Sequence, residues 1–200
     1  MLPRSTEKTI DANATTGIDE AGRGPLAGPV FAAVVILDNR KIITGLNDSK
    51  KISEKNRELI AEEIKLKATS WSIGKSTSNE IDEINILEAT LLAMKRAIEG
   101  LDSSPDIIYV DGTFAPETAI KVKTLIKGDQ SNKNIMAASI LAKVHRDNYM
   151  REIDVIYPQY GFKQHKGYPT KMHLEALKSY GISKEHRLSF KPVRTINESS

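Results

Sequence analysis

Residues 16–30 read Thr-Gly-Ile-Asp-Glu-Ala-Gly-Arg-Gly-Pro-Leu-Ala-Gly-Pro-Val, a short strand that runs into two acids and then into a glycine-rich loop. The strand is predicted at Thr16–Asp19, and the apolar run Val30–Leu37 predicts a second strand that is buried on both faces. Asp106–Asp111 predicts a further strand, which also ends in an acid and is followed by Gly112. Burying an unpaired carboxylate inside a strand is very costly. We therefore expect these strand ends to be neighbours that project their carboxylates into one cleft.

A further acid, Asp129, follows the next predicted strand, Ile120–Ile126. It could complete a cluster with Asp19, Glu20 and Asp111. Because it lies beside a glycine, Asp129 fits a turn or a helix cap equally well. The turn or cap interpretation is the less favoured alternative for the other three acids, which end two separate strands. From these residues alone, the position of Asp129 in the cluster stays open.

The acids predict a site for hard divalent cations. Carboxylates held close together raise one another's pKa unless a cation neutralises them. The chain has no cysteine, and its histidines show no metal-pair spacing. Ligands that are all oxygen atoms favour Mg²⁺ or Mn²⁺, and two such ions would activate a water and stabilise the leaving oxygen of a phosphodiester. The histidines are expected at the surface or facing phosphates, and not as ligands: His145, His165, His173 and His186.

The rest of the chain alternates strands with helices. A further strand is predicted at Thr69–Thr77, and helices are predicted from the Ser53 cap to Lys67, over Ile86–Leu101, over about 132–156, and from the Thr170 cap to Gly181. This order predicts an α/β fold with a mixed sheet flanked by helices on both faces. Residues 1–15 show no hydrophobic period and are predicted to be a flexible lead-in. Residues 16–193 are predicted to form one domain, followed by a short tail over residues 194–200.

Composition narrows the class of protein. The 200 residues are 40% hydrophobic and 28% charged, which is typical of one soluble globular domain. We find no apolar run long enough to span a membrane and no secretory signal, and together with the absence of cysteine this predicts a cytoplasmic protein. The net charge of +3 is too small to indicate a nucleic-acid partner by itself. Nothing in the pattern requires a dimer, so a monomer is expected.

The acids belong to blocks that stretch over nearly the whole chain: Gly17–Val30, Asn47–Lys50, Val110–Gly112, Lys127–Asp129, Ala137–Val144, His165–Tyr168 and His186–Phe190. In this order and register the blocks resemble the ribonuclease HII family, the type 2 ribonucleases H. Any one block is moderately specific, but all of them in register are very hard to obtain by chance. The resemblance implies the ribonuclease H-like fold, with a five-stranded mixed sheet, and makes residues 16–193 its catalytic domain.

The resemblance implies an endonuclease that uses Mg²⁺ or Mn²⁺ to hydrolyse the RNA strand of RNA–DNA hybrids. It also implies nicking on the 5′ side of single ribonucleotides embedded in duplex DNA, a step of ribonucleotide excision repair. A two-metal mechanism would leave 3′-hydroxyl and 5′-phosphate ends. Two alternatives are a ribonuclease HIII-like hybrid nuclease without single-ribonucleotide activity, and a non-catalytic hybrid-binding protein. Tyr168 and the Gly22–Gly24 loop argue against the first, and the intact set of acids argues against the second.

The resemblance also implies roles for individual residues. It assigns metal binding and catalysis to Asp19, Glu20, Asp111 and Asp129, and so favours the ligand interpretation of Asp129. In the family, the loop at Gly22, Arg23 and Gly24 meets the backbone around the scissile phosphate, and the ring of Tyr168 packs on the sugar at the RNA-to-DNA junction. The remaining implied contacts, near the nucleic-acid backbone, are Asn47, Ser49, Lys50 and Lys143.

Overall fold

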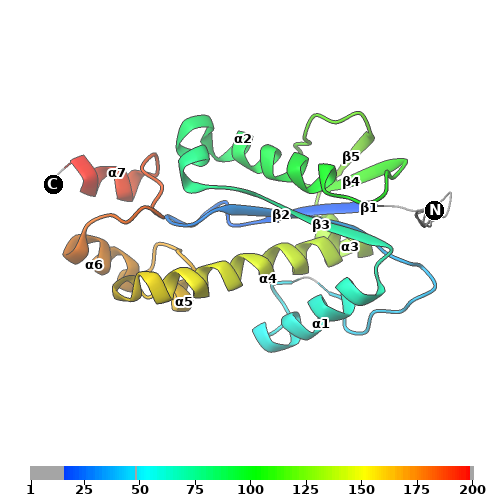
Figure 1. Ribbon diagram of the computed structural model, residues 1–200, viewed down its shortest axis with the longest axis horizontal. Coiled ribbons are helices and arrows are strands. Elements are labelled where there is room, and N and C mark those ends of the chain that lie inside the picture. The colour runs from blue at the N-terminus through cyan, green and yellow to red at the C-terminus, as the bar shows by residue number, and fades with distance from the viewer. Residues whose placement is uncertain (1–15, 48, 199–200) are drawn as a thin grey trace, which may run out of the picture.

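The computed structural model describes residues 16–47 and 49–198. Over these residues five strands form one sheet in the order β3-β2-β1-β4-β5 (Figure 1). β1, β2 and β3 are antiparallel neighbours, and β4 and β5 run parallel to β1. The strands are β1 (Thr16–Ala21), β2 (Val30–Ile36), β3 (Ser70–Ser76), β4 (Ile107–Asp111) and β5 (Lys121–Leu125). The predicted mixed five-stranded sheet is confirmed, while the predicted lead-in over residues 1–15 lies outside the described residues.

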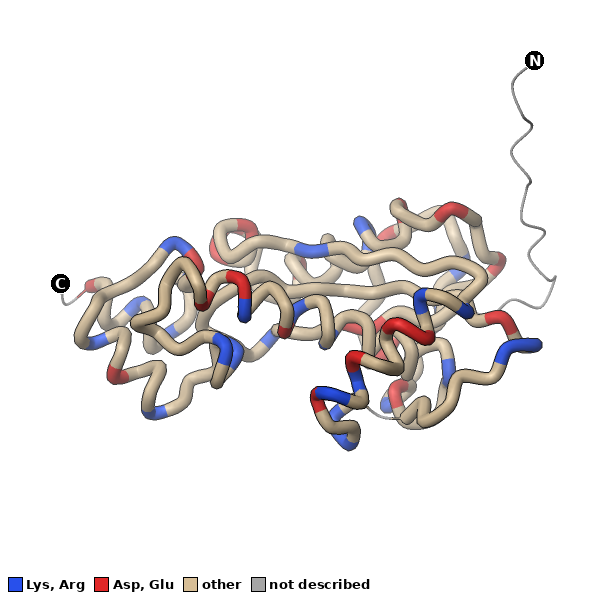
Figure 2. Tube along the Cα trace, turned by 60° about the horizontal axis from the view of Figure 1, so that its bottom comes forward, with Lys and Arg blue, Asp and Glu red and all other residues tan. Residues whose placement is uncertain are grey.

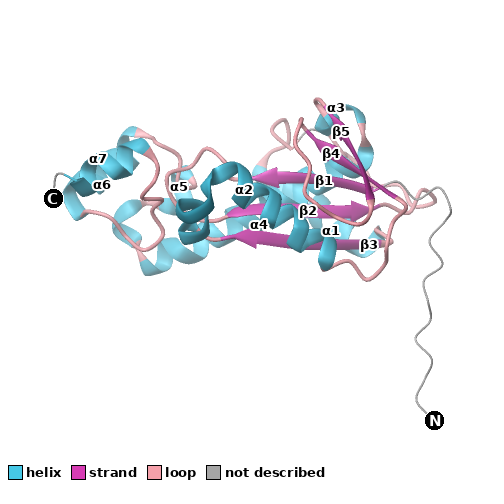
Figure 3. Cartoon of the chain, turned by 90° about the horizontal axis from the view of Figure 1, so that it is seen from above, coloured by secondary structure: helices cyan, strands magenta, loops and turns pink. Residues whose placement is uncertain are grey.

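Helices cover both faces of this sheet, as predicted (Figure 1). Helix α2 (Ser78–Glu99) packs on one face, and α1 (Glu54–Lys67) and α4 (Lys133–Ile156) pack on the other. A short helix, α3 (Gly128–Ser131), joins β5 to α4. Seen from above, the last helices of the chain gather beyond one end of the sheet (Figure 3). The core is therefore three-layered around the strands that carry the acids.

The long helix α4 lies very close to the central strand β1. A Cβ added at Gly17 would lie 2.2 Å from backbone atoms of both Asn134 and Ile135, so no side chain fits at that position. The Asn134 side chain also accepts a hydrogen bond from the Leu37 N–H at 2.9 Å, which ties the start of α4 to the end of β2. The first half of α4 is consequently pressed against the sheet, as its apolar sequence predicts.

The two predicted helix caps each accept a backbone N–H group, Ser53 at α1 and Thr170 at α6 (Lys171–Tyr180). Helix α2 extends further toward the N-terminus than predicted, to Ser78, while its segment after the break at Asn85 begins at Ile86 as predicted. Thr77 and Glu80 form a capping box at its start. That signal lies ahead of the hydrophobic period on which the predicted boundary rested.

Helix α2 is broken at Asn85, whose φ of 68° and ψ of 167° are not helical. The segment before the break is held by contacts outside the helix. The Asp82 carboxylate accepts hydrogen bonds from the backbone N–H groups of Leu188 and Ser189, each at 2.8 Å. The first turns of α2 are thus anchored to the C-terminal segment, and the helix breaks directly after them.

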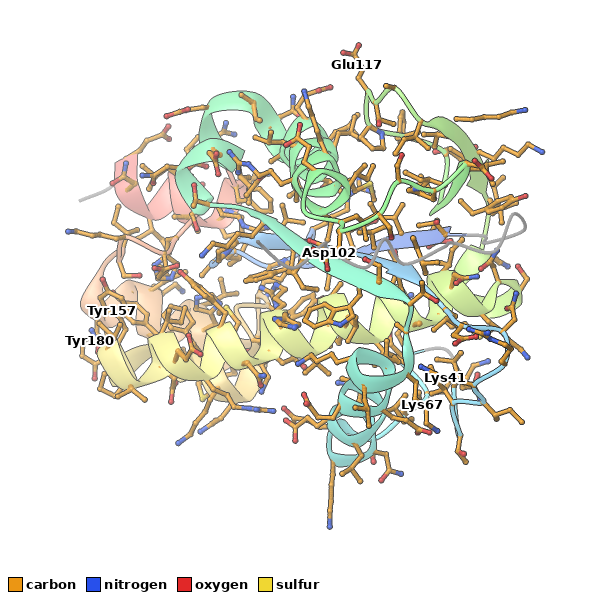
Figure 4. The ribbon with its side chains drawn as sticks, turned by 45° about the vertical axis from the view of Figure 1, so that its right-hand side comes forward. Lys41, Lys67, Asp102, Glu117, Tyr157 and Tyr180 are labelled. Carbon is orange, nitrogen blue, oxygen red and sulfur yellow. The ribbon has the colours of Figure 1, made fainter. Side chains whose placement is uncertain are left out.

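The C-terminal part of the chain forms a second core beside the end of the sheet. Besides α6 it contains η1 (Pro158–Tyr160), α5 (Phe162–His165) and α7 (Lys191–Glu198), which pack together with Leu26 and Ala27 of the loop after β1. Tyr157 and Tyr180 lie at this end in Figure 4, with their ring centroids 6.4 and 6.3 Å from that of Tyr160. Residues 194–198 of the predicted tail are helical, and residues 199–200 lie outside the described residues.

Three of the four histidines were predicted at the surface and are instead buried in this second core. His165, His173 and His186 are at most 7% exposed, and the rings of His165 and His173 stack with centroids 4.4 Å apart. Burial lowers the pKa of His173 to about 4 and that of His186 to about 3, so both rings are neutral at physiological pH. The prediction was wrong because the aromatic residues that enclose them, such as Phe162, approach only through tertiary packing.

Charged residues of both signs are interspersed along the whole trace (Figure 2). The net charge of +3 therefore does not mark one part of the molecule as a binding surface. Within the described ranges, no helix has the combination of length and apolar character that crossing a membrane requires.

We expect Gly17→Ala to destabilise the protein by about 3 kcal/mol or more, because the added methyl group would overlap the backbone of α4. Gly24→Ala is the matched control, since its Cβ would meet only Tyr168 at an ordinary 3.6 Å. Urea unfolding monitored by circular dichroism measures both variants. Equal unfolding midpoints for the two would contradict the close packing of α4 on β1.

Candidate active site

The parallel pairing of β1 with β4 brings two of the predicted catalytic acids together. The register pairs Ile18 with Val110, and its continuation sets Asp19 beside Asp111 where both strands leave the sheet. Paired residues of neighbouring strands project to the same face, so the two carboxylates share a side. The next residue of β1, Glu20, projects to the opposite face of the strand end.

The Asp19 side chain is buried, with 6% of the residue exposed. Burial is the main cause that raises the pKa of its carboxyl well above the usual range, and the charges of Glu20 and Asp111 raise it further. A side-chain hydrogen bond with Ser139 of α4 and the Glu20 N–H at 2.7 Å act in the opposite direction. Burial also raises the pKa of Glu20, although the Arg23 guanidinium at 3.5 Å partly offsets this.

Asp129 reaches the cluster by a different route from the one predicted. It does not end a strand but lies in α3, two residues after Lys127. Lys127 adopts a left-handed backbone with φ of 56°. That turn directs the Gly128 N–H at the carboxylate of Asp111, with a distance of 2.7 Å. Burial raises the pKa of Asp111, and the charge of Asp129 adds to the rise. Asp129 itself forms an ion pair with Lys50 at 3.4 Å.

These acids supply oxygen donors suited to a hard divalent cation. Among residues 16–47 and 49–198, however, no three His, Asp or Glu side chains converge to hold an ion as they stand. The acids instead contact groups within the protein: Asp111 accepts a hydrogen bond from Gly128, and Asp129 forms an ion pair with Lys50. The negative charge around Asp19 is nevertheless poorly compensated. A divalent cation fits this set of donors and its excess charge, provided that the side chains rotate toward it.

The loop after β1 is held from below by two buried arginines. Arg187 is 0% exposed and donates to the carbonyl oxygens of Gly22, Arg23 and Gly28 at 2.6–3.0 Å. Arg146, 1% exposed, packs directly beneath Gly22, where an added Cβ would lie 2.2 Å from its Nε. Gly22 also has a φ of 104°, which disfavours any other residue. The glycine in this position is therefore required both by the backbone conformation and by the close approach of the guanidinium.

The loop after β1, three of the four acids and Tyr168 border one cavity of about 270 Å³. The predicted site residues that line it are Asp19, Glu20, Gly22, Arg23, Gly24, Ser49, Lys50, Asp111, Lys143 and Tyr168. Asp129 is not part of the wall and adjoins it through Asp111 and Lys50. Asn47 is exposed and does not line the cavity. Sequence reasoning brought together most of this wall from blocks far apart in the chain.

Two lysines on the cavity wall differ in how far their side chains are exposed. The side chain of Lys50 is 80% exposed, whereas Lys143 is half-buried and bonded to Asp147 at 2.5 Å. Burial lowers the pKa of Lys143, with the Asp147 contact acting against the shift. Ser49 is buried and shares a hydrogen bond with Ser139 at 2.9 Å. Lys50 is therefore an exposed lysine paired with Asp129, while Ser49 is a buried residue beneath Asp19.

Tyr168 stands at the edge of the cavity with 45% of its surface exposed. Its ring lies over the guanidinium of Arg146, with 5.9 Å between the guanidinium carbon and the ring centroid. An aromatic face that is partly exposed and backed by a cation can pack on the apolar side of a sugar. The site thus combines carboxylates, a backbone loop and a ring around one opening.

Sequence reasoning gave no role to Ser139 and Arg187, which shape this site, and it did not predict that Arg146 is buried beneath the loop. Ser139 and Arg187 lie in or beside blocks that carried the resemblance, and so does Arg146. Nothing in the local pattern shows that an arginine is fully buried, because burial of a charged side chain depends on carbonyl groups that only the fold supplies.

The sequence is similar to those of known ribonucleases. The family model described as Ribonuclease HII matches residues 16–193. Ribonuclease HII of Aliivibrio fischeri, from strains MJ11 and ATCC 700601 / ES114, is 53% identical over 180 residues, which cover 90% of this chain and 87% of the relative.

Solved structures show the same fold. Ribonuclease H2 from Pyrococcus horikoshii OT3 superposes with a TM-score of 0.78 at 28% identity, covering 92% of this chain and 97% of the other. Ribonuclease HII of Archaeoglobus fulgidus, solved in complex with PCNA, gives 0.71 at 27% identity, with 91% and 96% covered. Bst-RNase HIII in complex with Mn²⁺ gives 0.71 at 16% identity, with 98% and 74% covered, and shares the fold alone.

We expect Asp19→Asn to stabilise the metal-free protein at pH 7 by about 1–2 kcal/mol, because it removes a buried charge beside two like charges. The folded-state pKa of Asp19 is raised above its unfolded value, so the ionised form costs stability at high pH. As the pH falls through the raised pKa, the wild type takes up the proton and recovers that stability. The gain from the substitution should therefore shrink toward pH 4. Thermal unfolding with chelator at several pH values tests this, and a gain independent of pH would contradict it.

Proposed function

The chain belongs to the ribonuclease HII family, so it is an endoribonuclease acting on RNA–DNA hybrids, and we propose that it also nicks duplex DNA 5′ of a single embedded ribonucleotide. One observation carries this proposal. Asp19, Glu20 and Asp111 border the same cavity as the Gly22–Gly24 loop and Tyr168. A scissile phosphate at these acids would therefore have its neighbouring sugars at the loop and the ring.

Asp19, Glu20, Asp111 and Asp129 would hold the divalent ions of this reaction. The uncompensated charge around Asp19 supports this assignment, as does the Mn²⁺ held by the distant relative Bst-RNase HIII. When bound, two Mg²⁺ or Mn²⁺ ions would supply an activated water and stabilisation of the leaving 3′ oxygen. The ends left would be a 3′-hydroxyl and a 5′-phosphate.

The loop over Gly22, Arg23 and Gly24 would recognise the ribose. Its carbonyl groups are fixed from below by Arg187, so its upper backbone edge is presented in one conformation. Backbone groups that hydrogen-bond a 2′-hydroxyl discriminate strongly against DNA, because deoxyribose leaves them without a partner. Arg23 is 45% exposed in its side chain and extends the loop toward the phosphate backbone.

Tyr168 and the nearby polar residues would position the rest of the duplex. The exposed ring of Tyr168 is suited to pack on a deoxyribose, which lacks the 2′-hydroxyl that would obstruct a close approach. Lys50 and Lys143 would contact phosphates and give affinity that falls with salt. We assign Ser49 to the floor under these contacts and Asn47, which lies further out, to the approach of the nucleic-acid backbone.

We also propose that the enzyme acts as a cytoplasmic monomer in the excision of ribonucleotides from DNA. One chain supplies all of the acids and every predicted substrate contact, which supports a monomer. The lack of cysteine is consistent with a reducing compartment.

The proposed activity is tested with an end-labelled DNA duplex that contains one ribonucleotide, alongside an all-DNA duplex and a long RNA–DNA hybrid. With Mg²⁺ or Mn²⁺ we expect a nick on the 5′ side of the ribonucleotide and none in the all-DNA duplex. Asp111→Asn should lower the rate by at least about 10²-fold, since it removes a carboxylate that would hold the divalent ions. Cleavage of the long hybrid alone would overturn the proposal and favour a ribonuclease HIII-like specificity.

Substitutions of Tyr168 separate its ring from its hydroxyl. We expect Tyr168→Phe to retain nicking at a single ribonucleotide, and Tyr168→Ala to lower that rate by roughly tenfold relative to cleavage of the long hybrid. The measurement is the ratio of kcat/KM on the two substrates. A ratio unchanged in Tyr168→Ala would show that the ring does not read the junction.

A further inference from the structure

The three buried histidines form one group beside the backbone of Tyr168, joined by a hydrogen bond between two of the rings and by stacking of the third. The Nε2 atoms of His173 and His186 lie 3.0 Å apart, and the Nδ1 of His173 lies 2.9 Å from the backbone oxygen of Tyr168. His165 stacks on His173 from the side. The proposed chemistry gives these histidines no role, although His173 contacts the backbone of the residue whose ring is proposed to meet the substrate.

The hydrogen bonds determine which nitrogen of each ring carries the proton. The Nδ1 of His186 lies 2.9 Å from the Ser183 backbone N–H, which can only donate, so this Nδ1 must accept. The proton of the neutral His186 ring is therefore on Nε2 and is donated to Nε2 of His173. His173 must then carry its own proton on Nδ1, which donates to the Tyr168 carbonyl.

The third ring fits this order without conflict. The Gly167 N–H donates to Nδ1 of His165 at 3.2 Å, and Nε2 of His165 lies 2.8 Å from the Tyr160 carbonyl, to which it donates. Every ring nitrogen in the group thus has a partner of the right kind. Burial lowers the pKa of all three rings, which keeps them neutral, as this arrangement of protons requires.

The same backbone segment is tied to the loop that recognises the ribose. The Leu26 N–H donates to the Gly167 carbonyl and the Leu26 carbonyl accepts from the Arg187 N–H, at 2.8 and 2.9 Å. Arg187, next to His186, is the residue that holds the loop carbonyls. His186 and Arg187 therefore reach the two sugar-reading elements from adjacent positions, one through His173 and the other directly.

We propose that His186 and His173 form a proton-ordered relay that positions the backbone of Tyr168 against the Gly22–Gly24 loop, and so sets the preference for a ribonucleotide followed by a deoxyribonucleotide. This inference rests on the proposed function. His173 and His186 are positioning residues, because neither lines the cavity. The relay acts by holding one carbonyl group, and it leaves the carboxylates untouched.

Two amide substitutions at His173 separate the relay from simple packing. Asparagine places its amide nitrogen near the position of Nδ1 and can still donate to the Tyr168 carbonyl. Glutamine places its amide near Nε2, so it can keep the contact with His186 but not the one with Tyr168. Both variants lose part of the ring volume and one hydrogen bond, and they are therefore matched in their cost to the core. His145→Gln is the control for loss of a histidine elsewhere, since His145 lies against Trp71.

The measurement is the ratio of cleavage rates on the single-ribonucleotide duplex and the long hybrid. We expect His173→Gln to lower this ratio by roughly three- to tenfold, the equivalent of one lost hydrogen bond, while His173→Asn and His145→Gln stay near the wild-type ratio. Equal ratios in the Asn and Gln variants would overturn the proposal. A wild type that does not nick the single-ribonucleotide duplex would instead overturn the proposed function.

A second measurement needs no substitution and keeps the relay testable if both variants fail to fold. Nitrogen-15 NMR of histidine-labelled wild-type protein reports the tautomer of each ring. We expect the proton on Nδ1 of His173 and on Nε2 of His186 and His165. A proton on Nε2 of His173 would leave the Tyr168 carbonyl with the Thr170 N–H as its remaining donor among the described residues. It would therefore contradict the relay, whatever the activity of the enzyme.

Discussion

Strands β1 and β4 run side by side in parallel, and this pairing sets Asp19 next to Asp111 at the end where both leave the sheet. The rest of the site is arranged around that contact. Helix α4 packs tightly over Gly17, on the face of β1 that carries Asp19, and Asp19 keeps only 6% exposure although it lines the cavity. Two like charges are thus held side by side, one of them largely shielded from water. The fold itself creates the concentration of negative charge that a divalent cation would relieve.

The positive side of the site is built differently, from arginines that have carbonyl groups as partners instead of carboxylates. Arg187 and Arg146 donate to backbone oxygens. Burial lowers their pKa to about 9 and about 10, which still leaves them charged at neutral pH. Carbonyl partners satisfy the donors without cancelling the charge. Positive charge therefore remains beneath the loop and Tyr168, on the side where a polyanion would lie.

The acids and the elements proposed to read the sugars are supported by separate parts of the fold. The acids stand on the sheet and on the turn into α4, whereas the loop and Tyr168 are held by the C-terminal core. Asp82 joins the two parts, because it anchors the segment that contains Arg187 to the start of α2. The break in α2 at Asn85 follows directly after this anchored segment.

The sequence by itself determined the mixed α/β sheet, the boundaries of most strands, the caps at Ser53 and Thr170, and the family to which the chain belongs. These depend on local signals, namely hydrophobic period, capping side chains and motifs in register. It also indicated that Asp19 and Asp111 would lie close together, because a carboxylate at the end of an apolar strand is costly to bury alone and is expected to face a cleft. The route of Asp129 through a left-handed turn was not visible, since Lys127 carries no local mark of that conformation.

Only the tertiary structure decided that three histidines are buried and that Arg187 and Arg146 support the loop. Their partners are backbone carbonyl groups and aromatic rings far away in the chain, and a backbone carbonyl looks the same in every residue. A pattern of side chains can therefore predict where charge is costly, as at Asp19. It cannot predict where the main chain will turn so that its carbonyl groups satisfy a buried charge, as the Gly22 carbonyl does for Arg187.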